Sequence, residues 1–118
     1  MRILVCGGRD YLNVGRIHDA LDAVRRKHGI EVLIHGAASG ADTIAGSWAM
    51  LNGVEVEQYP ADWERHGRRA GPIRNRQMVE LGRPDAVVAF PGGSGTRDMV
   101  EYATFCGIRV WEVDKQQS

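Results

Sequence analysis

Residues 85–96 read DAVVAFPGGSGT, an apolar run that leads directly into a glycine-rich turn. The apolar run, residues 85–90, predicts a strand buried on both faces, because the central strands of parallel sheets are hydrophobic at nearly every position. Residues 91–96 then hold three glycines within four positions, and residues 97–106 have helical periodicity. This order of strand, turn and helix predicts one unit of an α/β fold.

The same order recurs along the rest of the chain. Further strands are predicted over residues 3–6, 31–35, 54–58 and 109–113. Further helices are predicted from Ile17 to a stop at Gly29, over residues 42–51 and over residues 73–81. Residues 59–72 are polar and predict a long loop, and residues 115–118 predict a tail. No hairpin signal joins two strands, so we predict one α/β domain over residues 1–118, with about five parallel strands and helices on both faces.

Composition narrows the class of protein. A chain of 118 residues can bury roughly two-thirds of its unfolded surface, which is enough for a core. The net charge is zero, which argues against a general binder of polyanions. Cys6 and Cys106 form no CxxC motif, which excludes a disulfide framework and fits a reducing compartment. The longest uncharged run, residues 43–54, is too short for a membrane span and no signal-peptide pattern precedes the first strand, so we expect a cytoplasmic protein without membrane contacts.

The turn at residues 91–96 is the first candidate site. In a parallel sheet, ligands bind at the carboxyl ends of the strands, where glycine lets backbone N–H groups face an anion and a helix N-terminus adds positive potential. The turn is not a Walker A loop, because no Gly-Lys-Ser/Thr sequence follows it. A tight turn with Thr96 as a simple helix cap is the alternative. The candidate phosphate-binding residues are Gly92, Gly93, Ser94, Gly95 and Thr96.

Two more glycine-rich turns follow the first two strands. In the turn of Gly8, Arg9, Asp10 and Tyr11, the arginine could hold a phosphate and the tyrosine could stack on a base. A solvated turn with one surface salt bridge is the alternative for these residues.

The turn over residues 36–42 is built from small residues that permit the close approach of a ligand. We select Ala38, Ser39 and Asp42 as candidate contacts. Asp42 lies in the first turn of the predicted helix, where it could accept hydrogen bonds from a ribose hydroxyl or a base. Equally, it could only cap the helix or complement its dipole.

The segment before the third predicted helix is rich in arginine, with five between residues 65 and 76. Guanidinium groups suit phosphate, although some of these arginines are expected to be solvated surface, since this chain uses arginine for 13 of its 15 basic residues. Arg74 and Met78 are four apart and share a helix face. The candidate ligand contacts of this region are Asp62, Trp63, Arg74, Asn75 and Met78.

Candidates for catalysis are few. Asp98 and Glu101 follow the phosphate turn at a spacing of three and could act as a carboxylate pair, with Arg74 as a partner, or could only neutralise nearby arginines. The histidines lack metal-ligand spacing, so we expect no metal site and no bound cofactor.

Taken together, these motifs resemble the YspA-type, cpYpsA-related family of the SLOG superfamily. The matching motifs span nearly the whole chain, at residues 7–11, 36–42, 60–63, 71–78 and 89–96. The resemblance implies a Rossmann-like fold and a nucleotide or nucleotide-derived ligand. Because SLOG proteins are commonly homo-oligomers, it also implies at least a dimer.

Two relatives of that family share parts of the pattern. The LOG phosphoribohydrolases, which release the base from nucleoside monophosphates, carry a PGGxGTxxE motif that this chain matches except for Met99 in place of the glutamate. Asp98 is one residue early, and one residue rotates a helical side chain by about 100°, so Asp98 is not a direct substitute for the glutamate. The DprA family of DNA-processing proteins shares the Arg-Asn-Arg segment at residues 74–76, but this chain lacks the stacking aromatics and positive charge of a single-strand binder.

The leading hypothesis is therefore a protein that binds a nucleotide or an ADP-ribose-like molecule, as a sensor or a sequestering protein. An N-glycosidic hydrolase is the second hypothesis. Binding of single-stranded nucleic acid is the third, and we do not expect nucleic acid as a partner.

Overall fold

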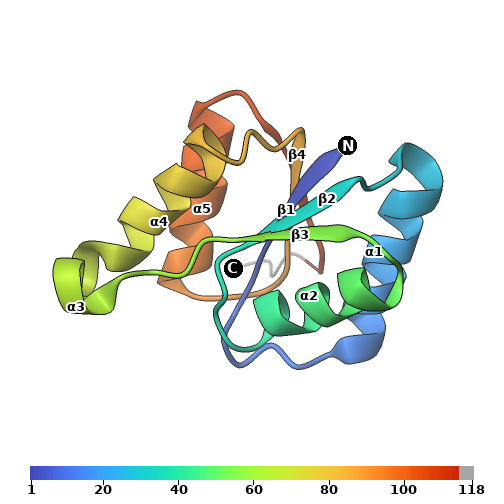
Figure 1. Ribbon diagram of the computed structural model, residues 1–118, viewed down its shortest axis with the longest axis horizontal. Coiled ribbons are helices and arrows are strands. Elements are labelled where there is room, and N and C mark those ends of the chain that lie inside the picture. The colour runs from blue at the N-terminus through green and yellow to red at the C-terminus, as the bar shows by residue number, and fades with distance from the viewer. Residues whose placement is uncertain (115–118) are drawn as a thin grey trace.

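The computed structural model describes residues 1–114, which form a five-stranded parallel sheet with helices on both faces (Figure 1). The strands are β1 (Arg2–Cys6), β2 (Val32–His35), β3 (Glu55–Gln58), β4 (Ala86–Ala89) and β5 (Arg109–Glu112). The helices are α1 (Val14–His28), α2 (Ala41–Leu51), α3 (Trp63–His66), the 3-10 helix η1 (Gly67–Arg69), α4 (Ala70–Glu80) and α5 (Ser94–Phe105). The predicted Rossmann-like α/β class is confirmed, while the expected tail at residues 115–118 lies outside the described residues. Within residues 1–114, no helix has the length and apolar character needed to cross a membrane.

The order of the strands places a crevice at one edge of the sheet. The order is β3-β2-β1-β4-β5, and every neighbouring pair is parallel. The chain moves outward from β1 to β3, then returns to pair β4 with the other side of β1. The β1–β4 pair is therefore the switch point, and in such sheets the carboxyl ends of these two strands flank the ligand crevice.

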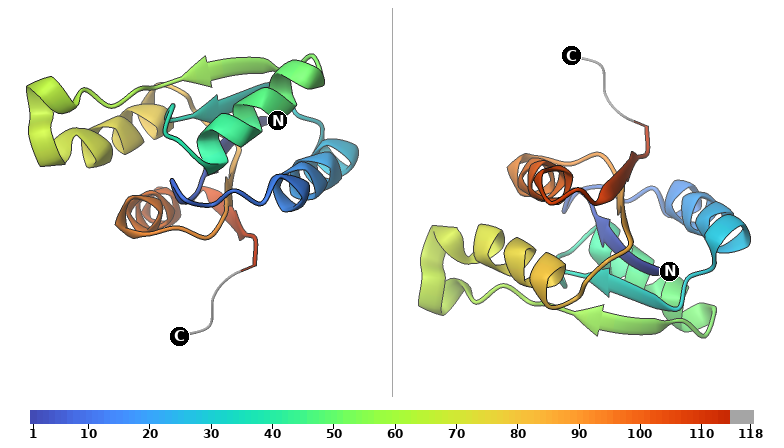
Figure 2. Two further views of the ribbon diagram at one scale, coloured as in Figure 1. Left: turned by 90° about the horizontal axis from the view of Figure 1, so that it is seen from below. Right: turned by 90° about the horizontal axis from the view of Figure 1, so that it is seen from above.

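The core has two layers, one on each face of the sheet. Helices α1 and α2 cover one face and α4 and α5 cover the other (Figure 2). Side chains alternate along β1, so that Ile3 and Val5 pack in the layer of α1 and α2, whereas Leu4 lies in the layer of α4 and α5. Trp48 of α2 is buried in the first layer, and its indole N–H donates to Asp22 of α1 at 2.9 Å.

The prediction of a long loop over residues 59–72 is wrong from residue 63 onward, because α3, η1 and the start of α4 occupy residues 63–72. Asp62 starts α3 by accepting a hydrogen bond from the backbone N–H of Arg65 at 3.1 Å. No residue of α3 or η1 is buried, so these turns carry no apolar periodicity that could reveal a helix. The helix after β4 also begins earlier than predicted, at Ser94 instead of residue 97.

The three glycine-rich turns pack backbone against backbone at the carboxyl edge of the sheet. Gly8 donates its N–H to the carbonyl of Pro91 at 2.9 Å, and its own carbonyl accepts the N–H of Ala41 at 3.2 Å. Gly40 has a φ of 75°, and a Cβ there would overlap the carbonyl oxygens of Gly8 and Arg9. Glycine is therefore required at this position both for its backbone conformation and for the close approach of two turns.

Comparison of two glycines with positive φ tests this close approach. Gly53 has a φ of 69°, but nothing lies within 4 Å of the position of its Cβ. We expect Gly53→Ala to lower the free energy of unfolding by about 1 kcal/mol, which is the cost of the left-handed conformation for alanine. Gly40→Ala should cost roughly 2 kcal/mol more, because it adds overlap with backbone atoms that cannot rotate away. Urea denaturation measures both values, and equal losses would show that the turns can separate freely.

Candidate functional site

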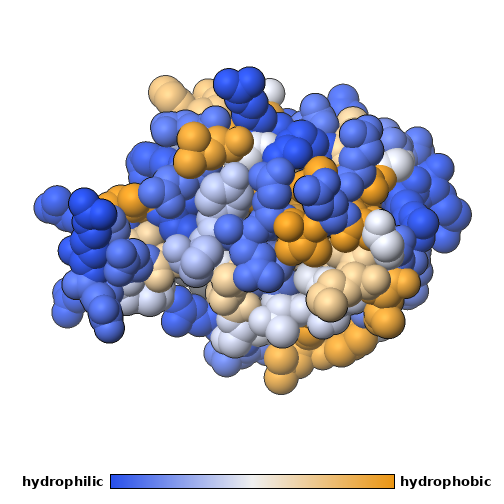
Figure 3. Space-filling model, viewed as in Figure 1, coloured by the Kyte–Doolittle hydropathy of each residue, from blue (hydrophilic) through white to orange (hydrophobic). Residues whose placement is uncertain are grey.

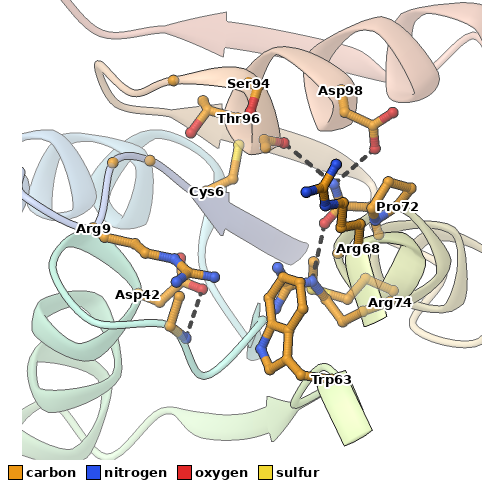
Figure 4. A pocket seen from close by; sticks show the side chains of 18 residues that line it. Cys6, Arg9, Asp42, Trp63, Arg68, Pro72, Arg74, Ser94, Thr96 and Asp98 are labelled. Atoms are coloured by element: carbon orange, nitrogen blue, oxygen red, sulfur yellow. Dashed lines mark hydrogen bonds between the residues drawn. The ribbon is translucent and has the colours of Figure 1, made fainter. Parts of the chain in front are cut away.

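A pocket of about 610 Å³ opens at the carboxyl ends of β1 and β4 (Figure 4). This volume lies within the range of small-molecule binding sites. Four segments line it: the end of β1 with its following turn, the turn into α2, the segment from α3 through α4, and the first turns of α5. The pocket is thus at the switch point that the strand order defines.

The N-terminus of α5 forms one wall of the pocket. Gly93 is the N-cap of α5, and no side chain caps this end of the helix. The N–H groups of the first helical turn, which begins with Ser94 and Gly95, have no acceptor in the preceding turn of a helix. Nothing lies within 4 Å of the Cβ positions of Gly93 and Gly95, so a ligand can approach this backbone closely.

Gly92, in contrast, serves the packing of the turns. A Cβ at Gly92 would overlap the hydroxyl of Thr96 and would lie 2.6 Å from the backbone nitrogen of Gly8. Gly92 does not line the pocket, although it belongs to the same glycine-rich turn. One turn therefore contains glycines of two kinds, of which only Gly93 and Gly95 face the site.

Three arginines face the pocket from other elements. Arg74 of α4 donates through Nη1 to the carbonyl of Gly36 at 2.6 Å, and its guanidinium fills the space that a side chain at Gly36 would need. Burial lowers the pKa of Arg74, and the Asp42 carboxylate opposes this shift. Arg9 follows β1, and Arg68 lies in η1, at an end of the molecule whose surface is hydrophilic (Figure 3).

These arginines are available to an anion. None of Arg9, Arg68 and Arg74 forms an ion pair within residues 1–114, where the pairs found involve Met1, Arg2 and Arg16 as the cations. An unpaired guanidinium in a partly enclosed pocket favours the binding of phosphate, because its forked donors match phosphate oxygens.

Asp42 organises the turn between β2 and α2. It is 6% exposed, and its Oδ2 accepts the N–H groups of Gly36 at 3.0 Å and Ala38 at 3.2 Å. Burial raises the pKa of Asp42 to about 6, against the opposing effects of these hydrogen bonds and of Arg74 and Arg9. Because both backbone bonds go to one oxygen, the second carboxylate oxygen can accept hydrogen bonds from a ligand.

Asn75 connects Arg74 of α4 to the first turns of α5. Its Oδ1 accepts the Nε–H of Arg74 at 3.1 Å, and its amide nitrogen donates to the Oδ2 of Asp98 at 2.9 Å and to the carbonyl of Gly95 at 3.2 Å (Figure 4). Asn75 is buried, so these bonds fix the orientation of both charged side chains.

The two candidate carboxylates lie apart. Asp98 lines the pocket, whereas Glu101 is exposed and lies outside it. Met99, between them in sequence, is completely buried in the core layer that also contains Met78. Of the two alternatives for Asp98 and Glu101, a carboxylate pair at the pocket is therefore not formed.

Most residues selected from the sequence meet at this pocket. Those that line it are Gly8, Arg9, Ala38, Asp42, Trp63, Arg74, Asn75, Met78, Gly93, Ser94, Gly95, Thr96 and Asp98. Those that do not are Asp10, Tyr11, Ser39, Asp62, Gly92 and Glu101. The ring of Tyr11 instead packs on Phe90, with ring centroids 5.7 Å apart, which moves it away from any ligand in the pocket.

Sequence reasoning missed five lining residues, namely Cys6, Gly7, Arg68, Gly71 and Pro72. Cys6 is the last residue of β1 and Gly7 follows it, and their position at the carboxyl edge could have suggested them. Gly71 and Pro72 lie in the stretch that the sequence predicts as a loop. Arg68 belongs to the arginine-rich segment, but nothing in the sequence separates it from its neighbours.

Comparison with known proteins found two matches to the sequence. The model of the YspA, cpYpsA-related SLOG family matches residues 1–66, which include two of the glycine-rich turns, Asp42 and Trp63. The Gene 61 protein of Mycobacterium phage D29 is 41% identical, and the match covers 92% of this chain and 93% of the phage protein.

The raised pKa of Asp42 predicts a dependence of stability on pH. In the unfolded chain an aspartate takes up its proton near 3.8, whereas Asp42 in the folded protein does so at about 6. Between these two pKa values the folded state therefore binds more protons at Asp42 than the unfolded state does. Protonation of Asp42 thus stabilises the folded protein at low pH, and this stabilisation is lost as the pH rises through about 6. In Asp42→Asn, the amide oxygen can accept both backbone N–H groups and nothing titrates.

We therefore expect the stability of Asp42→Asn relative to the unmodified protein to increase as the pH is raised from about 4 to about 7. Urea unfolding of both proteins across this range measures the difference, in which all other titrating groups cancel. A difference that is constant with pH would mean that Asp42 titrates normally in the folded state.

Proposed function

This chain belongs to the YspA, cpYpsA-related SLOG family, and from that premise we propose that it binds a nucleotide or a nucleotide-derived compound, such as an ADP-ribose-like molecule. One observation carries the proposal. The N-terminus of α5 and Arg9, Arg68 and Arg74 face the same pocket of about 610 Å³ at the switch point of a parallel sheet, and within residues 1–114 no side chain caps this helix end and none of these arginines forms an ion pair. This combination suits a small ligand that carries phosphate.

In this proposal the phosphate lies against the first turn of α5, where Gly93 and Gly95 leave the backbone open. Arg74 adds positive charge from the neighbouring helix α4, and the second carboxylate oxygen of Asp42 accepts a hydrogen bond from a hydroxyl of the sugar. A phosphate bound in this way exchanges water for charge-assisted hydrogen bonds in a partly enclosed site.

The proposed role is that of a sensor or a sequestering protein. Met99 stands where the LOG hydrolases carry their glutamate. Its thioether is buried in the core, and it can neither stabilise a cation by charge nor transfer a proton. Assembly into a homo-oligomer and a cytoplasmic location stay predictions.

Two glycines at equivalent helix positions test the phosphate site. Gly95 is the second residue of α5 and Gly15 is the second residue of α1, and neither Cβ position would clash. Valine is a better helix former than glycine, so both Gly95→Val and Gly15→Val should fold. Only the side chain at residue 95 would occupy the space that the phosphate needs.

We expect isothermal titration to show binding of AMP or ADP-ribose to the unmodified protein. Gly95→Val should lose at least about tenfold in affinity, equivalent to about 1.4 kcal/mol, while Gly15→Val stays within about twofold. Undiminished affinity in Gly95→Val would show that the phosphate does not bind against the N-terminus of α5.

A second candidate function, hydrolysis of an N-glycosidic bond, is favoured by one observation: the carboxylate of Asp98 lines the pocket and is oriented by Asn75. In this reaction water would add to C1′ of the ribose as the base leaves with a proton, and a carboxylate would stabilise the positive charge that develops on the sugar. Asp98 is one helical position away from the glutamate of the LOG hydrolases.

The two functions differ in whether free base is produced. We expect no multiple-turnover release of base from a panel of nucleoside monophosphates, followed by chromatography, because the residue at the hydrolase position is Met99. Repeated turnover that disappears in Asp98→Asn but persists in Glu101→Gln, an exposed carboxylate on the same helix, would establish the hydrolase instead.

A further inference from the structure

Trp63 is a large aromatic side chain that the fold leaves accessible beside the pocket. It is the first residue of α3, it is 47% exposed, and it lines the pocket. A tryptophan at the surface leaves much apolar area in water, which is unfavourable unless another group covers it. Its position therefore needs an explanation beyond the packing of α3.

The ring of Trp63 is supported on one side by α4. The Cη2 atom of the indole lies 3.5 Å from the position that a Cβ on Gly71 would take. Gly71 is buried, and this separation is an ordinary van der Waals distance, so the edge of the ring rests against the start of α4. This contact gives a short, exposed helix a fixed aromatic group.

A guanidinium covers the face of that ring. The Cζ atom of Arg9 lies 5.3 Å from the centroid of the Trp63 ring, in a cation–π contact. The two residues come from elements far apart in the sequence, the turn after β1 and the start of α3, and both line the pocket (Figure 4). A cation–π contact at an exposed site contributes little, so a flat group and an anion together can displace it.

We propose that Trp63 is the residue on which the base of the ligand stacks, and that Arg9 leaves the ring to bind the phosphate. This inference rests on the proposed function and deepens it, because it assigns the recognition of the base to Trp63 and part of the recognition of the phosphate to Arg9. The base takes the place of the Arg9 guanidinium on the face of the Trp63 ring. Arg9 then exchanges its weak cation–π contact for a charge-assisted hydrogen bond to the phosphate. The sequence suggests Tyr11 for the base, but its ring packs on Phe90.

A pair of ligands that differ only in the base tests the proposal. AMP and ribose 5-phosphate are titrated into the unmodified protein, Trp63→Leu and Trp63→Phe, with circular dichroism as a check of folding. We expect Trp63→Leu to lose about tenfold or more in affinity for AMP while its affinity for ribose 5-phosphate changes by less than about twofold. Trp63→Phe should retain most of the affinity for AMP, because phenylalanine also offers an aromatic face.

Arg9 and the fluorescence of Trp63 supply two further readouts. Arg9→Gln should weaken the binding of both ligands, because both carry the phosphate. AMP, but not ribose 5-phosphate, should quench tryptophan fluorescence in the unmodified protein, and this quenching should be absent in Trp63→Phe.

The outcomes separate the two proposals. If Trp63→Leu lost equal affinity for AMP and for ribose 5-phosphate, the proposed function would stand but the role of Trp63 in stacking would be overturned. If the unmodified protein binds none of AMP, ADP-ribose and ribose 5-phosphate, the proposed function fails, and this inference fails with it.

Discussion

The backbone of Gly8 connects the three glycine-rich turns on which the site depends. Its N–H is bonded to Pro91 in the turn before α5, and its carbonyl is bonded to Ala41 at the start of α2. These bonds form only if the turns meet without side chains, which is why Gly40 and Gly92 are required where they stand. Because the turns are fixed to one another, the N-terminus of α5, Arg9 and Asp42 face one pocket.

The pocket keeps charged groups in a partly buried setting at a cost to stability. Asp42 is desolvated, and Arg74 carries a guanidinium whose pKa burial lowers. Backbone groups of the turn after β2 satisfy both side chains: the N–H groups of Gly36 and Ala38 for Asp42, and the carbonyl of Gly36 for Arg74. Apolar residues would stabilise the same turn at lower cost, so this pair of buried charges fits the proposed role in binding a ligand rather than a role in stability.

Several elements were accessible to sequence reasoning because their signals are local. The apolar strands β1 and β4, the stop of α1 at Gly29 and the glycine-rich turns each follow from residue type and spacing. Strand–helix alternation then implies a parallel sheet, which brings the turns to one edge and makes them candidates for a site. The α3 and η1 turns gave no such signal, because polar residues without buried positions have no hydrophobic period.

The sequence by itself determined the fold class, the edge of the sheet at which the turns gather, and Arg74 as a pocket residue. Only the tertiary structure decided which neighbours face the pocket: Asp98 and not Glu101, and Trp63 and not Tyr11. On α5 the reason is helix geometry, since Asp98 and Glu101 are three residues apart, which turns their side chains by about 60° and separates them by about one turn of the helix, so that the packing of α5 brings only Asp98 to the pocket. Tyr11 lies in the turn after β1, and the packing of its ring on Phe90 keeps it out of the pocket. Contacts between distant segments, such as Arg9 over Trp63, depend on that packing and leave no pattern in the chain.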